Sequence, residues 1–274
     1  TDYPDRFMLD DGELLRLLGL AREAGALVLV HAINGSATAA LLELAEQRGE
    51  LDEPRFHAAY RPAVLEGEAT ARVAALAQVA GAPVYIVHVS CVEALEAIRA
   101  GRARGVVVHA ETCPHYLFLD QRRLALPDFE GARYVCPPPL RPPGHPEALW
   151  RAVEGGEVDT VATDHCPFDR AQRELGRRDF RAIPNGLPGI ETRMVLLYQG
   201  VVQGRISPSR WVDLAATRPA QLMGLSRKGT LTPGADADVV VWDPEGQTDL
   251  SQRALHMRVD YSPYEGMRLR GAVR

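Results

Sequence analysis

The sequence predicts an α/β fold with a parallel sheet covered by helices. Short apolar runs without polar alternation recur along the chain, as expected for strands that are buried on both faces. A stretch with helical periodicity follows each run, so strands and helices alternate. Such β-α-β units place their strands parallel and cross over with a right hand. About four units can be counted, against the eight that close a β/α-barrel.

Local signals place each element in turn. Asp10 and Glu13 form a D-x-x-E capping pattern, and the helix that follows is expected to end at Gly25. The buried strands are expected at residues 26–30, 84–87, 106–108 and 158–162. The helices between them are expected at residues 41–47, 64–79, 92–99 and 146–155, with a loop at residues 51–62. Residues 134–141 are too rich in proline for a central strand.

The C-terminal part of the chain has a different character. Helices are expected at residues 190–202 and 208–223. Residues 235–242 then alternate polar and apolar side chains and reach a turn signal at Asp243-Pro244, which predicts one strand of a separate β layer. We therefore expect two domains, residues 1–228 and residues 229–274.

The composition excludes several classes of partner. The 274 residues carry a formal net charge of −5, which gives no electrostatic case for binding nucleic acid or an anionic membrane. No apolar run approaches the length that spans a bilayer, and no signal peptide is expected at the start. The four cysteines show no C-x-x-C spacing, which favours an intracellular, cytoplasmic protein with reduced thiols.

Three of the predicted strands end in a side chain that can bind a metal, namely His31, His88 and Asp164. In a β/α-barrel the carboxyl ends of the strands meet at the face that holds the active site. Imidazole and carboxylate groups suit Zn²⁺, Mn²⁺, Ni²⁺ or Fe²⁺. We therefore expect imidazole nitrogens of His31 and His88 within roughly 4 Å, about twice a Zn–N bond, with Asp164 open to the same cavity.

Each of these residues also has a simpler interpretation. A single histidine at a strand end is more often a packed core residue than a ligand, and Asp164 could instead cap the helix that follows. His165 could orient Asp164. The other histidines are expected either at the surface (His57, His145 and His256) or in support of the carboxyl ends of the strands (His109 and His115).

Several longer motifs are more specific than single residues. They are His31-Ala-Ile-Asn-Gly35, Tyr60-Arg-Pro62, Glu66-Gly-Glu-Ala-Thr70, Val87-His-Val-Ser90, Glu111-Thr-Cys-Pro-His-Tyr116, Ala162-Thr-Asp-His-Cys-Pro-Phe168 and Ile183-Pro-Asn-Gly-Leu-Pro-Gly-Ile-Glu191. In this order, and over essentially the whole chain, they resemble the D-hydantoinase/dihydropyrimidinase branch of the cyclic amidohydrolases. Lys228-Gly-Thr-Leu231 and residues 234–244 resemble this family's return to its small β domain. Dihydroorotase and allantoinase are similar but match residues 183–191 less well.

The resemblance implies a (β/α)8 TIM barrel with a β-sandwich and a two-metal site, with zinc as the favoured metal. Residues 1–228 correspond to the second, C-terminal half of the barrel, and residues 229–274 to part of the sandwich. In this family a hydroxide and a carboxylated lysine bridge the metals. His31 and His88 fall where the family binds its second metal. Asp164 falls where the family binds the first metal and shuttles the proton.

The resemblance also implies a reaction, the hydrolysis of a hydantoin or dihydropyrimidine to an N-carbamoyl amino acid, with Asp164 as the catalytic acid and base. Tyr3 falls where the family's tyrosine donates to the developing oxyanion. Asn185 falls where the backbone binds the cyclic amide. Pro137 stands where the family has a serine whose backbone contacts substrate, which makes Cys136 a neighbour of that contact. Relatives commonly form tetramers, so a homo-oligomer is expected.

The chain also departs from the family pattern. It has no His-x-His pair, its only lysine, Lys228, lies in the wrong element to bridge two metals, and Ile33 replaces an acidic residue. Residues 271–274 carry no stop signal for the last strand. We therefore expect an internal piece of a longer protein that by itself holds at most one metal and has little activity. The alternative is a non-catalytic dihydropyrimidinase-like protein that serves as an assembly partner.

Overall fold

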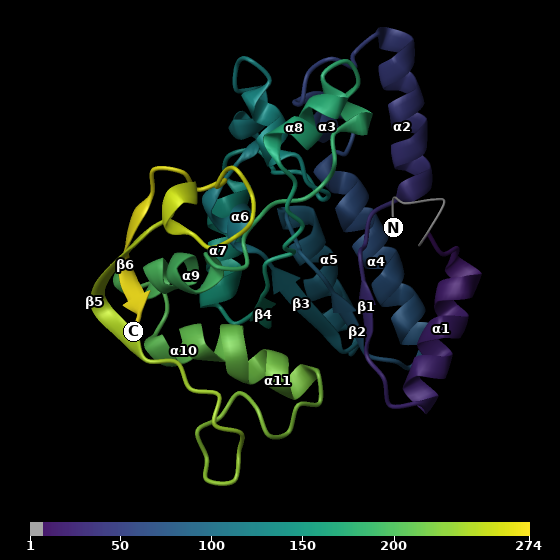
Figure 1. The fold of residues 1–274 in the computed structure, drawn as a ribbon. Helices are drawn as coiled ribbons and strands as arrows, with labels where there is room; N and C mark the ends of the chain where they lie inside the picture. Colours follow the sequence, from purple (N-terminus) through teal and green to yellow (C-terminus); the bar gives the residue numbers. More distant parts are fainter. Residues whose placement is uncertain (1–7) are drawn as a thin grey trace.

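The computed structural model describes residues 8–274, and its centre is a parallel sheet with the strand order β1–β2–β3–β4 (Figure 1). The strands are β1 Val28–Val30, β2 Val84–Ile86, β3 Val108–Thr112 and β4 Thr160–Val161. Each strand pairs with the next one along the chain, and Val84 aligns with both Val28 and Val108. The predicted alternation of strands and helices is therefore confirmed, but β1 is not buried on both faces as expected, since Leu29 is 48% exposed.

The long helices of this region are α1 Asp11–Glu23, α2 Gly35–Arg48, α4 Ala63–Ala80, α5 Val92–Ala103 and α7 His145–Glu154. Helix α4 lies between α1 and α5 (Figure 1) and packs against both. Its buried face consists mostly of alanine, glycine and threonine, so neighbouring helices can come close. A Cβ at Gly67 would lie 2.6 Å from the Cβ of Glu93 on α5, so this contact requires glycine. No helix within residues 8–274 is long and apolar enough to cross a membrane.

Capping residues set the helix boundaries. The predicted capping box is confirmed, because the Glu13 backbone N–H donates to Asp10 at 2.7 Å and the Asp10 backbone N–H donates to Glu13 at 2.9 Å. Helix α2 begins well before the predicted residue 41, because Asn34 accepts from the backbone N–H of Ala37 and caps it. The expected loop at residues 51–62 contains a short helix, α3 Phe56–Ala59.

The helices of the C-terminal part are α9 Arg193–Val202, α10 Pro208–Val212 and α11 Arg218–Leu222, with one π-helical turn between the last two. Two antiparallel strands follow, β5 Trp242–Asp249 and β6 Arg268–Val273. The predicted strand at residues 235–242 with a turn at Asp243-Pro244 is wrong. Strand β5 begins at Trp242 and passes through Pro244, where the register shifts between Asp243 and Gln247.

The misplaced strand has a physical explanation. The alternation signal came from apolar side chains, but Val239, Val240 and Val241 are 61%, 68% and 61% exposed. Residues 235–241 join no strand ladder within residues 8–274, and a strand is stable only where a neighbour pairs with its backbone. The ladder forms instead from Trp242 onward, where β6 supplies the partner.

An aromatic cluster attaches the β5–β6 pair to the helices. Tyr198 of α9 and Trp211 of α10 pack against Trp242 of β5, with ring centroids 5.0 Å and 4.8 Å away. Gly271 of β6 lies directly over this cluster, since a Cβ there would lie 2.5 Å from the Trp242 ring. Its φ of 103° also favours glycine. Aromatic pairs of this geometry add about 0.5–1.5 kcal/mol each beyond their buried area.

His115 makes stability depend on pH. It lies in α6 Pro114–Phe118, directly after β3, and burial lowers its pKa to about 3. In the unfolded chain a histidine titrates near pH 6.5, so below that pH the unfolded state binds a proton at residue 115 that the folded state does not bind. The contribution of His115 to the free energy of unfolding is therefore complete above pH 6.5. It should decrease as the pH drops toward 3, by up to about 1.4 kcal/mol per pH unit.

Urea unfolding at pH 7, 6 and 5 measures this effect, with His115→Phe as the comparison. The Phe variant fills a similar volume and cannot be protonated, so its unfolding free energy should fall less steeply with decreasing pH. Equal slopes for His115→Phe and wild type would contradict the prediction.

Candidate metal and substrate site

His31 and His88 meet at the carboxyl ends of β1 and β2. Nδ1 of His31 lies 2.8 Å from Nε2 of His88, and the two rings are nearly perpendicular. The predicted approach within roughly 4 Å is therefore confirmed. Two imidazole nitrogens on one tetrahedral zinc lie about 3.3 Å apart, given Zn–N bonds of about 2.05 Å. The pair would have to open by only about half an ångström, so its spacing is compatible with two of the ligands of one metal.

His88 and Asp164 share an unusual backbone conformation. Their φ angles are 42° and 45°, in the left-handed region that costs most side chains roughly 1 kcal/mol or more. His88 lies two residues after the end of β2 and Asp164 three residues after the end of β4, so both strained residues lie just beyond the carboxyl end of a strand. Strain of this kind persists only where the surrounding structure enforces it, and it concentrates at functional sites.

Hydrogen bonds hold the strained turn after β2. The backbone N–H of His88 donates to the Glu111 carboxylate at 3.3 Å, and the N–H of Val89 donates to the Glu111 carbonyl at 2.6 Å. The N–H of Ser90 donates to Glu66 at 2.8 Å. Three consecutive backbone groups are thus bound, which fixes the direction in which the His88 side chain leaves the turn.

A buried ion pair lies behind this turn. Arg141 donates to Glu66 at 2.8 Å and to the hydroxyl of Ser90 at 2.8 Å, and its third nitrogen donates to the Arg61 carbonyl at 2.6 Å. Glu66 is 2% exposed and Arg141 is 4% exposed. Glu66 belongs to one of the sequence motifs, but its partner Arg141 does not, because no sequence periodicity connects residues 75 positions apart.

Asp164 lies exposed after β4, and it does not cap a helix. Partial burial of its carboxyl group removes water from the carboxylate and so raises its pKa, and the nearby charge of His31 opposes this shift. The N-cap of α8 Arg170–Arg173 is Asp169, so the capping interpretation of Asp164 is wrong. Among residues 8–274 no three His, Cys, Asp or Glu side chains form a group that could hold one metal. His31 and His88 form a close pair, and Asp164 stands near them without completing the set.

His165 contacts a different loop from the one expected. Its Nδ1 accepts from the backbone N–H groups of Gly189 and Ile190, at 3.0 Å and 3.2 Å. It therefore orients the end of the 183–191 motif and not the Asp164 carboxylate. His109 pairs with Asp159 at 3.5 Å near the amino ends of β3 and β4, away from the end it was expected to support.

A polar chain that sequence reasoning missed crosses the sheet beneath the site. The Tyr85 hydroxyl donates to Glu111 at 2.6 Å and contacts the Thr160 hydroxyl at 2.5 Å. These residues lie on β2, β3 and β4 in turn. Burial raises the pKa of Glu111, and burial together with the Glu111 charge raises the pKa of Tyr85. Glu111 entered the sequence analysis only as the first residue of a motif, which carried no sign of these partners.

The segments predicted to bind substrate lie side by side. The backbone N–H of Gly186 donates to the Val135 carbonyl at 3.0 Å, which places Asn185 close to Cys136 and Pro137. Cys136 and Pro137 are buried. The side-chain oxygen of Asn185 is also buried, with no hydrogen-bond partner in residues 8–274. Such an acceptor is available to an N–H group of a ligand. Tyr3 lies outside the described residues.

His57 is a buried residue, so its predicted surface position is wrong. It is 1% exposed, and its Nε2 donates to the Cys136 carbonyl at 3.0 Å. The Phe180 ring packs edge-on against it at 6.4 Å. The segment 51–62 has no periodicity from which this burial could have been inferred.

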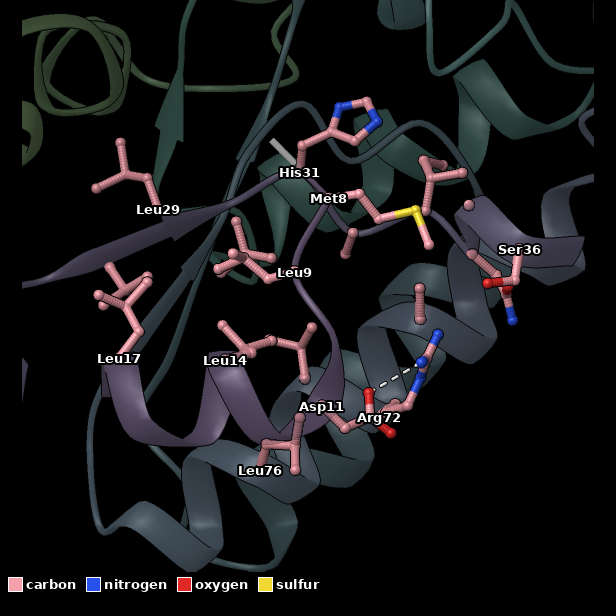
Figure 2. Close-up of a pocket in the computed structure, with 18 residues that line it drawn as sticks. Met8, Leu9, Asp11, Leu14, Leu17, Leu29, His31, Ser36, Arg72 and Leu76 are labelled. Atoms are coloured by element: carbon pink, nitrogen blue, oxygen red, sulfur yellow. Dashed lines mark hydrogen bonds and ion pairs between the residues drawn. The ribbon is translucent and has the colours of Figure 1, made fainter. Parts of the chain in front are cut away.

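A cavity of about 390 Å³ opens beside His31. Figure 2 shows it between α1, β1 and α4, with His31 at one end and Leu17 and Leu76 at the other. The cavity is mostly apolar, and the Asp11–Arg72 ion pair lies at its edge. His88 and Asp164 do not line it, so it is not the shared cavity predicted for the three residues.

Parallel strands joined by helices, with polar side chains gathered at their carboxyl ends, define an α/β protein of the class that carries its functional site at this edge of the sheet. A sequence model of the amidohydrolase family matches residues 3–271, and the chain belongs to that family. It is 53% identical to the D-hydantoinase of Streptomyces coelicolor over 99% of this chain and 58% of that protein. It is 49% identical to the D-hydantoinase of Geobacillus stearothermophilus over 98% of this chain and 58% of that protein.

Solved structures agree with this assignment. The dihydropyrimidinase from Brevibacillus agri superposes with a TM-score of 0.96 at 48% identity, over 99% of this chain and 59% of that one. The L-hydantoinase from Arthrobacter aurescens superposes with a TM-score of 0.86 at 31% identity, over 97% of this chain and 59% of that one. The amidohydrolase α/β fold is thus shown, and the chain spans somewhat less than 60% of the length of these relatives.

Proposed function

We propose that this protein opens the ring of a cyclic amide, a hydantoin or a dihydropyrimidine, by hydrolysis to an N-carbamoyl amino acid. The observation that carries the proposal is the 2.8 Å approach of His31 and His88 at the ends of adjacent strands. The similarity to D-hydantoinases at about 50% identity supports the choice of substrate.

His31 and His88 would hold a divalent metal, with zinc favoured because imidazole nitrogen is among its preferred ligands. Such a metal polarises a carbonyl and acidifies a bound water toward neutral pH. Asp164 would take the proton of the attacking water and deliver it to the leaving nitrogen, because a carboxylate at this position can both accept and return a proton. Lys228 is ion-paired with Asp236 and Asp238, which supports the expectation that it has no part in the site.

The cyclic amide would lie against the adjoining segments around Cys136, Pro137 and Asn185. Pro137 has no N–H and can only accept through its carbonyl. The buried oxygen of Asn185 adds an acceptor for a ring N–H. Tyr3 would donate to the oxyanion, a role that rests on the Tyr-Pro motif alone.

We also propose the finer architecture that the resemblance implies. The four parallel strands would belong to the second, C-terminal half of a (β/α)8 barrel at residues 1–228, and residues 229–274 would belong to part of a smaller β-sandwich domain. The protein would act as a cytoplasmic homo-oligomer. A non-catalytic assembly role is the second candidate, because residues 8–274 hold no group of three metal ligands.

The full-length gene product loaded with zinc is expected to open hydantoin or dihydrouracil, to stop when a chelator removes the zinc, and to recover when zinc returns. His88→Ala should lower bound zinc and turnover together, because one imidazole cannot hold the metal in place of two. The exposed His256 gives the control variant, His256→Ala, which should keep both. Zinc content by mass spectrometry and product formation are the measurements. A zinc-loaded protein that opens neither ring would favour the assembly role.

A further inference from the structure

We propose that Arg173 is a positioning residue that sets the distance between the two segments predicted to bind the cyclic amide, residues 135–137 and residues 184–186. The inference rests on the proposed function, because those segments are assigned to substrate there. Arg173 lies on α8, outside every motif that the proposed chemistry uses.

The guanidinium of Arg173 connects both segments directly. Arg173 is 1% exposed, and its Nη1 donates to the Val135 carbonyl at 3.1 Å and to the Pro184 carbonyl. Its Nη2 donates to the Gly186 carbonyl. The group therefore binds the carbonyl that precedes Cys136 and the carbonyls on both sides of Asn185.

A second layer of contacts holds the guanidinium in place. Nη2 also donates to the Tyr261 hydroxyl at 3.0 Å, and that hydroxyl donates to the Arg133 carbonyl at 3.1 Å. The ring of Phe168 lies 5.4 Å from the guanidinium carbon, which links Arg173 to the loop that begins at Asp164. Three loops at the site thus meet at one side chain.

The buried guanidinium of Arg173 binds neutral groups in place of a carboxylate. Buried arginines are normally paired with a carboxylate, but no ion pair to Arg173 occurs in the described part of the chain. Its contacts go to backbone carbonyls and one hydroxyl. Backbone groups have no rotamers with which to adapt to a substrate. The distance between the segments 135–137 and 184–186 must therefore be set by a contact that holds both of them. Arg173 supplies that contact.

Gly186 keeps the spacing tight. Its φ is 140°, and a Cβ there would lie 2.5 Å from the Cβ of Cys166 and 2.6 Å from its carbonyl oxygen. The 184–186 segment is therefore pressed against the loop after β4 on one side and bound to Arg173 on the other. A loss of the guanidinium contacts would leave this segment and Val135 joined by a single backbone hydrogen bond.

The test compares Arg173→Met with Arg173→Lys in the zinc-loaded, full-length gene product. Methionine fills the space without a donor, whereas the lysine ammonium has three donors for the three carbonyls. Arg177→Met is the matched control, because Arg177 follows in the same segment but is exposed, and its contacts are an ion pair with Glu174 and the ring of Phe129, away from residues 135–137 and 184–186. KM and kcat are measured for hydantoin and for dihydrouracil, which have five-membered and six-membered rings.

Arg173→Met should raise KM about tenfold with kcat changed much less, and it should alter the preference between the two rings by about fivefold, because the spacing selects ring size. Arg173→Lys should recover most of the wild-type KM and preference, and Arg177→Met should match wild type. Wild-type KM and preference in Arg173→Met would overturn the positioning role, as would an equal change in Arg177→Met.

Tyr261→Phe keeps the inference testable if Arg173→Met does not fold. It removes one hydroxyl that holds the guanidinium and should raise KM about twofold to threefold at a nearly unchanged melting temperature. An unchanged KM in Tyr261→Phe would count against the positioning role. A wild-type protein that opens neither ring would overturn the proposed function itself, whereas an active wild type with unaffected variants would overturn the positioning role alone.

Discussion

Asp164→Asn is expected to lower kcat for ring opening by about 10²–10⁴-fold while the melting temperature stays close to the wild-type value. Asparagine keeps the shape of the side chain but cannot accept and return a proton. It also tolerates the left-handed backbone at φ 45° about as well as aspartate does. Because Asp164 is exposed and caps no helix, its replacement should cost little folding free energy.

The matched control for this experiment is Asp169→Asn. Asp169 occupies the N-cap of α8, where asparagine is as good a cap as aspartate, so turnover and stability should both be retained. Zinc content, melting temperature and kcat are best measured on one preparation of each variant, so that loss of metal is separated from loss of the proton carrier. A near-wild-type kcat in Asp164→Asn would remove Asp164 from the chemistry.

Arg141→Met is expected to lower the free energy of unfolding by about 3–5 kcal/mol. The change leaves the Glu66 carboxylate buried without its cation, and it removes the donor to the Ser90 hydroxyl. A second change, Glu66→Met in the same chain, should restore part of the loss, because neither charge is then left buried alone. Urea unfolding of the two single variants and the double variant measures both effects.

The exposed pair between Arg72 and Glu68 provides the comparison. Arg72 lies one helical turn from Glu68 on α4 and also pairs with Asp11, and all three side chains are at least 39% exposed, so Arg72→Met should cost at most about 1 kcal/mol for each of the two contacts. A loss in Arg141→Met as small as that in Arg72→Met would show that the buried pair contributes little. In that case the turn that carries His88 would depend mainly on Glu111.

The parts of the fold that sequence analysis predicted are those whose signals are local. Apolar runs located all four parallel strands approximately, although β1 is partly exposed and β3 continues to Thr112, beyond the expected residues 106–108. The Asp10–Glu13 pattern identified the start of α1, because helix capping depends on neighbouring residues. The β5 strand was misplaced for the opposite reason. The valines at 239–241 carry a strand-like pattern, but pairing depends on where β6 lies.

In the candidate site, too, the residues with a local sequence signal were predicted and those without one were not. His31 and His88 were found because each follows a predicted strand, and parallel strands bring their carboxyl ends together. The contacts around the site were not predictable: Glu66, behind the turn that carries His88, contacts an arginine 75 residues away, and Arg173, between residues 135–137 and 184–186, contacts Tyr261 88 residues away. Such pairs follow from tertiary packing, and neither composition nor periodicity carries information about them.

The aromatic cluster that holds β5 gives the folded protein a spectroscopic signal of its own. Two of its three tryptophans, Trp211 and Trp242, touch within the cluster, while Trp150 lies apart on α7 with its indole N–H bonded to the Leu117 carbonyl. Near-ultraviolet circular dichroism responds to fixed aromatic packing. Detachment of the β5–β6 pair would therefore alter the Trp211–Trp242 signal while Trp150 stayed buried, and local opening could be distinguished from global unfolding by spectroscopy alone.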